Sequence, residues 1–135
     1  MKKDTLWVPE RLCYALLRNG LGSRVTCCLV RTEAVPKSHL VPPSQRPTAQ
    51  RHYETMVVQG QLGNSTDIVL VDDVISRGAT IIGAADRLRD AFPNTNIGAF
   101  GAMRAVGNPA EFEKEFDPQS GVVYLRSDGQ SFRRP

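Results

Sequence analysis

The sequence predicts a single α/β domain built around a parallel sheet. The prediction rests on three consecutive segments: an aliphatic run at Ile68–Val71, an amphipathic helical pattern at Ala79–Phe92, and a second short apolar run at Ile97–Met103. A strand, a helix and a strand in this order form a right-handed parallel crossover. Because ligands of such sheets bind at the carboxyl ends of the strands, the residues that follow Val71 are the first place to look for function.

Length and composition limit the class of protein. The chain has 135 residues, which suffices for one domain, and 41% hydrophobic with 23% charged residues is typical of a soluble globular protein. No apolar run reaches the roughly 18 residues that a membrane span needs. The N-terminus also lacks the apolar stretch of a signal peptide. We therefore expect a cytoplasmic protein with no membrane partner.

The net charge does not distinguish between classes of ligand, whereas the cysteine content favours an intracellular protein. The net charge of +3 is small and its cations are scattered, so it suits a phosphate-rich small ligand as well as nucleic acid. The three cysteines, Cys13, Cys27 and Cys28, are an odd number without metal-ligand spacing. We expect them to be reduced, buried thiols and expect no zinc site.

The first third of the chain predicts a helix and a strand. Residues Pro9–Arg18 place apolar side chains at helical spacing, and Asn19-Gly20 supplies a C-cap. Residues Val25–Val35 begin as a β-branched, buried-type run and then alternate apolar with polar residues. This pattern predicts a strand that leaves the core and enters an exposed ribbon.

A long polar segment follows. Residues 36–52 contain four prolines, several cations and little to bury, which predicts a flexible loop of the kind that often carries function. The sequence ETMVVQG, at 54–60, predicts the strand that returns from it. After the second crossover strand we expect a helical patch at 110–116 and a C-terminal hairpin within 117–135, with its turn at Asp128-Gly129.

The segment IVLVDDVISRGAT, residues 68–80, combines a strand, two carboxylates and a short loop. The backbone N–H groups of Ser76–Thr80 can form an anion-binding nest at a helix N-terminus, where the helix dipole also favours negative charge. Gly78 permits a tight turn, and the hydroxyls of Ser76 and Thr80 can donate to phosphate oxygens. The loop therefore predicts a phosphate site.

Asp72 and Asp73 need a different role, because carboxylates repel phosphate. They can accept hydrogen bonds from the vicinal hydroxyls of a ribose, or orient a hydrated Mg²⁺ held mainly by oxygens of the ligand. The alternative is that they only end a strand and cap the next helix. A Walker A loop is excluded because no lysine follows the glycine, and a G-x-G-x-x-G fingerprint is missing. A sugar phosphate fits both halves of the segment.

The same segment resembles the phosphoribosyl-pyrophosphate (PRPP) binding motif of type I phosphoribosyltransferases. Upstream, VRTEAVPKSH and ETMVV are similar to the hood ribbon and catalytic loop of the orotate phosphoribosyltransferase branch, and RPTAQRHY is similar to ComF-like members. The resemblance covers about residues 9–106 and is strongest at 68–80. It implies a parallel, twisted, Rossmann-like sheet with a small antiparallel hood ribbon.

The resemblance also implies an activity and a set of site residues. The reaction would transfer the phosphoribosyl group of PRPP to a nitrogenous acceptor and release pyrophosphate, with Mg²⁺ as cofactor, and the bound ligand would be PRPP or a nucleoside monophosphate. The loop residues Lys37 and His39 would be catalytic together with Asp72 and Asp73, which would hold Mg²⁺ indirectly through ligand or water. Arg46 and Arg51 are possible pyrophosphate clamps. The PRPP-binding residues would be Asp72, Asp73, Val74, Ser76, Arg77, Gly78, Ala79 and Thr80.

The front of the chain departs from the family pattern. Only MKKDTLWV precedes the first predicted helix, so we expect the family's N-terminal strand and pyrophosphate loop to be absent, shortened or supplied by another chain. This leaves open a non-catalytic PRPP or nucleotide sensor that acts with a protein or nucleic-acid partner. An uncovered sheet edge would also favour a homo-oligomer or a protein partner. The acceptor base has no signature in the sequence.

Overall fold

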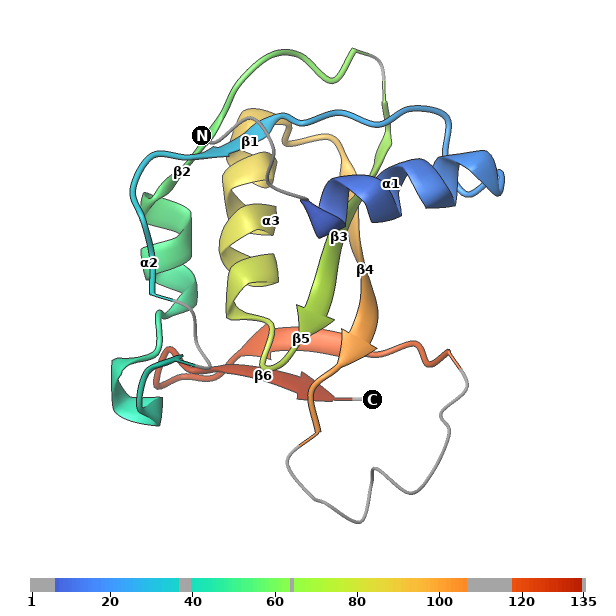
Figure 1. The fold of residues 1–135 in the computed structure, drawn as a ribbon. Helices are drawn as coiled ribbons and strands as arrows, with labels where there is room; N and C mark the ends of the chain where they lie inside the picture. Colours follow the sequence, from blue (N-terminus) through green and yellow to red (C-terminus); the bar gives the residue numbers. More distant parts are fainter. Residues whose placement is uncertain (1–6, 37–39, 64, 107–117, 135) are drawn as a thin grey trace.

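The computed structural model describes residues 7–36, 40–63, 65–106 and 118–134. Within them the chain forms a mixed α/β fold of small sheets and helices (Figure 1). The elements in order are α1 (Val8–Arg18), β1 (Leu29–Arg31), the 3₁₀ helix η2 (Pro43–Gln45), α2 (Ala49–Glu54), β2 (Met56–Val58), β3 (Asp67–Ile75), α3 (Ala79–Ala91), β4 (Asn96–Arg104), β5 (Val122–Leu125) and β6 (Ser131–Arg134).

The predicted strand, helix and strand are confirmed as β3, α3 and β4. The two strands pair in parallel, from Asp67 opposite Asn96 to Ile75 opposite Arg104. Among the described residues this sheet has two strands. Helix α3 covers one face, and α1 lies beside β3 (Figure 1). The fold is therefore α/β with a parallel sheet, in a smaller form than the resemblance implies.

The core lies between α3 and the sheet. Leu88 of α3 has no exposed surface, and it clusters with the buried side chains of Cys28 and Leu62. Partly buried apolar side chains from both parallel strands and from the end of α3 surround this cluster: Ile68, Leu70, Phe92 and Ile97. Burial of a large aliphatic side chain stabilises a fold by about 1.5–3 kcal/mol, so this contact holds the crossover together.

The predicted ribbon is present but short. Strands β1 and β2 pair antiparallel over three residues each, from Leu29 opposite Val58 to Arg31 opposite Met56. Residues 25–28 precede the pairing and belong to no strand, so the strand is shorter than the alternation at 25–35 predicted. The expectation that all three cysteines are buried was wrong: Cys28 is buried, Cys13 is partly buried, and Cys27 is exposed.

Helix α2 begins inside the segment that the sequence predicted as a loop. Thr48 caps it, because its hydroxyl oxygen accepts a hydrogen bond from the backbone N–H of Arg51 at 3.2 Å. Helix α2 then packs closely on α3 at Gly83, where an added Cβ would come within 2.5 Å of the carbonyl oxygen of Ala49. The polar composition of residues 49–52 predicted a loop. They are helical because Thr48 caps the helix and because Gly83 lets α2 pack closely on α3.

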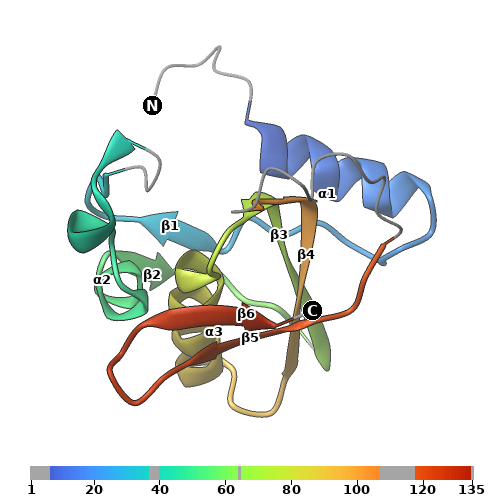
Figure 2. The same ribbon diagram turned by 90° about the horizontal axis from the view of Figure 1, so that it is seen from below.

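The C-terminal hairpin is confirmed. Strands β5 and β6 pair antiparallel, and the backbone N–H of Gln130 donates to a carboxylate oxygen of Asp128 in the turn at 2.9 Å. The hairpin crosses the carboxyl ends of β3 and β4, as seen from the side in Figure 1 and from below in Figure 2. The predicted helical patch at 110–116 lies outside the described residues. No helix of the described part is long and apolar enough to cross a membrane.

Candidate functional site

The motif strand is longer than predicted. β3 continues from Asp67 through Asp72 and Asp73 to Ile75, because its backbone pairs with β4 on both sides of Asp73, from Asp67 to Asp72 and again at Val74 and Ile75. The two aspartates therefore lie within the strand, near its carboxyl end. Consecutive strand residues point to opposite faces, so Asp72 and Asp73 cannot both face one ligand while the strand is regular.

The loop from β3 to α3 turns at Gly78. Its φ of +83° is in the left-handed region, which glycine adopts without strain. Gly78 is also the N-cap residue of α3, and the helix has no side-chain cap at this end. The first N–H groups of an α-helix have no acceptor within the helix. The loop thus leads to an uncapped helix N-terminus of the kind that binds anions.

A small cavity joins the loop to the polar segment upstream. It has a volume of about 30 Å³ and is lined by residues of both regions: Arg46, Pro47, Asp72, Val74, Ile75, Ser76, Arg77, Gly78, Ala79, Thr80 and Ile81. This volume holds about one or two water molecules. Bound PRPP would therefore require the cavity to open. The predicted PRPP-binding residues other than Asp73 all line it.

Arg46 has an unusual position in this cavity. Its Nε atom is buried and has no hydrogen-bond partner among the described residues. A buried donor without an acceptor costs about 1–3 kcal/mol. The guanidinium is a permanent cation whose planar donors match phosphate and carboxylate geometry. Because Arg46 lines the cavity, its guanidinium is a candidate donor to an anion there.

The two aspartates are held by backbone contacts. A carboxylate oxygen of Asp72 accepts a hydrogen bond from the N–H of Asp73 at 3.0 Å, and one of Asp73 accepts from the N–H of Val74 at 2.9 Å. Burial raises the pKa of Asp72 to about 6, with a smaller contribution from the neighbouring Asp73 carboxylate. Asp72 is thus mostly ionised at neutral pH, but it takes up a proton more readily than an exposed aspartate does.

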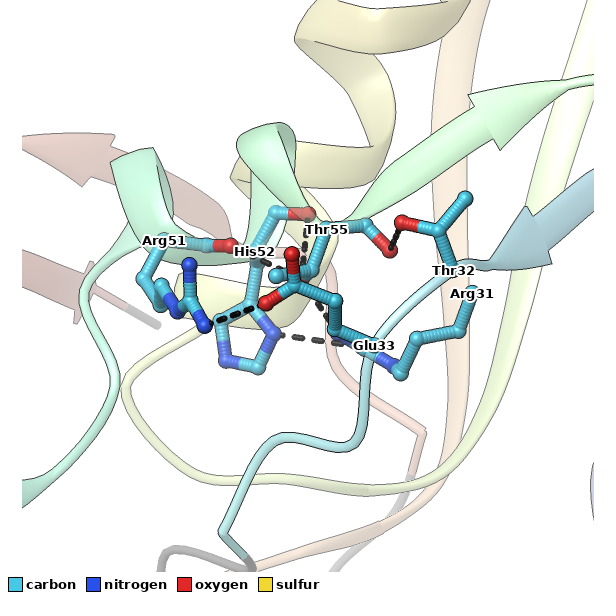
Figure 3. Close-up of polar contacts among 6 residues, drawn as sticks. All are labelled: Arg31, Thr32, Glu33, Arg51, His52 and Thr55. Atoms are coloured by element: carbon cyan, nitrogen blue, oxygen red, sulfur yellow. Dashed lines mark hydrogen bonds and ion pairs between the residues drawn. The ribbon is translucent and has the colours of Figure 1, made fainter.

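A second polar cluster lies beside the cavity, on α2 and β1 (Figure 3). His52 is 5% exposed, and its Nδ1 is 3.2 Å from a guanidinium nitrogen of Arg31. The Nε2 atom of the same ring is 3.3 Å from the hydroxyl oxygen of Thr80, which lines the cavity. Burial, followed by the charge of Arg31, lowers the pKa of His52 to about 4, so the ring is neutral at neutral pH.

The same cluster contains an exposed ion pair. A guanidinium nitrogen of Arg51 is 2.7 Å from a carboxylate oxygen of Glu33, and both side chains are largely exposed. Figure 3 shows this pair next to His52. Arg51, one of the two clamp candidates, therefore contacts Glu33 and does not line the cavity, whereas Arg46 does. Lys37 and His39 lie outside the described residues.

Sequence reasoning missed the residues around the motif. His52 and Arg31 were not singled out, although Thr48, followed by six residues without proline or glycine, signals that a helix begins there. Val123 of β5 was also missed. An added Cβ at Gly78 would lie 2.5 Å from a methyl carbon of Val123, so the hairpin sits directly on the loop. No local signal in the sequence predicts this long-range contact.

Comparison with known proteins gives no family for this chain. No family model matches it, and neither a curated protein nor a solved structure matches it significantly.

Proposed function

We propose that this chain binds PRPP at the carboxyl end of β3 and transfers its phosphoribosyl group to a nitrogenous acceptor, with release of pyrophosphate. The observation that carries the proposal is the cavity that Arg46 lines together with the uncapped N-terminus of α3. Two independent sources of anion-binding donors meet there. The 5′-phosphate of PRPP is the group that would accept from both.

The remaining residues of the site support a sugar phosphate. Ser76 and Thr80 line the cavity, and their hydroxyls can donate to phosphate oxygens. The ionised Asp72 carboxylate lines it too and can accept from a ribose hydroxyl. In the displacement at the anomeric carbon, the protein would position the ribose, neutralise charge and exclude water. Lys37 and His39 stay the predicted contacts to the pyrophosphate.

Mg²⁺ fits this site only as an ion shared with the ligand. No group of three histidine, cysteine or acidic side chains that could hold a metal gathers in the described part of the chain. Asp72 offers a carboxylate, and Mg²⁺ commonly takes one or two carboxylates together with substrate phosphates and water. When bound, the ion would neutralise the pyrophosphate, and Asp72 would hold it through water or ligand oxygens.

A second candidate function is a PRPP or nucleotide sensor without turnover. The observation that favours it is the contact of Val123 with Gly78, which places β5 over the phosphate loop. A cavity of about 30 Å³ cannot take up a sugar phosphate while this contact persists. Ligand binding would then move the hairpin and change the surface that it presents to a partner.

We also propose that a protein partner or a second copy of this chain binds to the sheet and the hairpin. Several large apolar side chains of the sheet and hairpin are exposed: Val69 by 60%, Phe100 by 38%, Met103 by 59% and Val122 by 62%. Large apolar side chains that are exposed on a sheet are candidates for burial against another chain. Sedimentation of the purified chain tests this part: association that buries Met103 should be lost in Met103→Glu, and a wild-type monomer would contradict it.

Calorimetry with PRPP and Mg²⁺ tests the binding proposal. Wild-type protein should bind, and Asp72→Asn should weaken binding by about tenfold or more, because a charged hydrogen bond contributes about 1.5–3 kcal/mol. Asp86→Asn is the matched control: Asp86 lies on α3 in an exposed ion pair with Arg89, so its change should leave PRPP affinity the same. Folded wild-type protein that does not bind PRPP would disprove the proposal.

A pyrophosphate-release assay separates the two candidate functions. An enzyme should release pyrophosphate from PRPP when a nitrogenous acceptor is supplied, and Asp72→Asn should slow that release. A sensor should bind PRPP without release, and its hairpin amides should exchange hydrogen faster in the presence of PRPP. Release without any change in hairpin exchange would argue against the sensor.

A further inference from the structure

Thr80 connects the cavity to the cluster around His52. It lies in the first turn of α3 and lines the cavity with Arg46 and Asp72. Its hydroxyl oxygen is 3.3 Å from Nε2 of His52, which belongs to α2. A hydroxyl can donate one hydrogen bond and accept others, so this contact alone does not say where the hydroxyl hydrogen points.

The contact at Nδ1, the other ring nitrogen of His52, determines which nitrogen carries the ring hydrogen. A guanidinium nitrogen of Arg31 is 3.2 Å from Nδ1 of His52. A guanidinium only donates, so Nδ1 of a neutral ring must accept, and the ring hydrogen must be on Nε2. The Nε2–H group then donates to the hydroxyl oxygen of Thr80.

The guanidinium of Arg31 is itself fixed in place (Figure 3). Its second terminal nitrogen donates to the hydroxyl oxygen of Thr55 at 2.9 Å. Thr55 has no exposed surface, and its hydroxyl donates in turn to the backbone carbonyl of Arg51 at 2.8 Å. Arg31 therefore cannot turn away from His52 without leaving a buried hydroxyl short of a donor.

We propose that His52 is a positioning residue: its Nε2–H group holds the Thr80 hydroxyl oxygen as an acceptor, so that the hydroxyl hydrogen is presented to an anion in the cavity. The inference depends on the proposed function for the identity of that anion, the 5′-phosphate of PRPP. The chain of donors from Arg31 through His52 to Thr80 runs in one direction, and it ends at the cavity.

The alternative is that His52 only joins α2, β1 and α3. A merely structural histidine would affect stability, and any effect on anion affinity would not depend on Thr80. The two roles are separable because the Thr80 hydroxyl can be removed at nearly constant volume by Thr80→Val. The readout is the affinity for an anion on both Thr80 backgrounds.

The experiment is a double-mutant cycle with inorganic phosphate and PRPP as separate probes. Thr80→Val and His52→Leu should each weaken the affinity by about tenfold, and the double variant should be no weaker than either alone. His52→Gln, whose amide can donate in place of Nε2–H, should restore part of the loss, and Thr80→Ser should bind like the wild type. Equal losses from His52→Leu on both backgrounds, or no loss, would overturn the proposal.

The tautomer of the His52 ring and the pattern of binding of the two probes give two further tests. Nitrogen chemical shifts of the His52 ring in the wild-type protein should report the Nε2–H tautomer, and an Nδ1–H tautomer would overturn the proposal even if the leucine variant does not fold. Binding of phosphate without PRPP, with the cycle as expected, would support the role of His52 and disprove the proposed function. Binding of neither probe would disprove both.

Discussion

The two polar clusters on either side of Thr80 differ in how well their hydrogen bonds are satisfied. On the α2 side, the guanidinium of Arg31 donates to His52 and Thr55, and the hydroxyl of Thr55 donates to the carbonyl of Arg51. On the cavity side, Arg46 keeps a buried Nε that has no partner in the described part of the chain, and α3 begins without a side-chain cap. The buried groups of the first cluster are joined by hydrogen bonds, whereas in the second the Nε of Arg46 lacks an acceptor among the described residues.

This difference assigns the two clusters different roles. A buried polar network with all its bonds made adds rigidity and fixes one arrangement of the chain. A buried donor without a partner lowers stability, and in a native protein it often marks a place where a ligand completes the bonding. The cluster around His52 would thus act as a rigid support, and the cavity as the place where the ligand binds.

The largest expected effect comes from separating α2 from α3. Gly83→Val would push a side chain against the carbonyl oxygen of Ala49 and the Cβ of His52, which a Cβ at this position already approaches within 2.5 Å and 2.7 Å. We expect a loss of about 3 kcal/mol in the free energy of unfolding, measured with urea. Gly98→Ala, where an added Cβ meets nothing within 4 Å, is the control and should change stability little. Equal stability of both variants would mean that the helices are not in close contact.

Replacing the arginine of each cluster by methionine tests whether the two clusters have different roles. Arg31→Met leaves Nδ1 of His52 and the hydroxyl of Thr55 without a donor and should cost about 2 kcal/mol of stability. Arg46→Met removes a donor that has no partner among the described residues, so stability should stay equal or rise, while phosphate affinity falls. Urea unfolding and phosphate titration of both variants measure this. A larger stability loss at Arg46 than at Arg31 would reverse the roles of the two clusters.

The pH dependence of stability should show opposing contributions from the two clusters. His52 has its pKa lowered from 6.5 to about 4, so the unfolded chain binds a proton first and stability falls as the pH decreases through this window. Asp72 has its pKa raised from 3.8 to about 6, so the native state binds a proton first and stability falls as the pH rises through that window. The two effects partly cancel in the wild type.

Asp72→Asn should remove the contribution of Asp72 to the pH dependence of stability and leave that of His52. Its free energy of unfolding should rise by about 1.5 kcal/mol between about pH 5 and about pH 6.5, more steeply than that of the wild type. Urea unfolding at several pH values in this range measures the slope. An equal slope in both proteins would mean that the carboxyl of Asp72 does not have a raised pKa.

The smallest effect is expected at the exposed ion pair. Arg51 and Glu33 have side chains that are 48% and 61% exposed, and such pairs contribute about 0–1 kcal/mol. Arg51→Met should change the free energy of unfolding by less than about 0.5 kcal/mol, and salt should have little effect on the difference. A loss above about 1 kcal/mol would show that Arg51 belongs to the rigid cluster after all.

The sequence was most informative where local patterns decide the structure. The crossover from β3 through α3 to β4 was predicted because aliphatic runs and helical spacing act over short stretches, and the hairpin because Asp128-Gly129 is a turn signal. The end of β3 was misplaced by four residues, since the strand pairs with β4 at Asp72 and again at Val74 and Ile75. Alternation along this longer strand is what separates Asp72 from Asp73.

The supporting residues were harder to predict, because their positions depend on contacts between distant segments. Arg31 and His52 are 21 residues apart, and His52 and Thr80 are 28 residues apart. Loop-like composition around His52 concealed a helix that is stabilised by its contact with α3. The prediction for Asp72, Ser76 and Thr80 needed only the motif, whereas the role of His52 needed the packing of three elements.

The contact between Gly78 and Val123 has a consequence for how this chain can vary over evolution. Position 78 has a left-handed backbone and lies 2.5 Å, measured from an added Cβ, from a branched side chain of another strand. A side chain at 78 is therefore strained even beside a smaller residue at 123, so position 78 should stay glycine among orthologues and position 123 should not exceed valine in size. Drift in the hairpin is thereby restricted by the loop that it covers, although the two are 45 residues apart in the sequence.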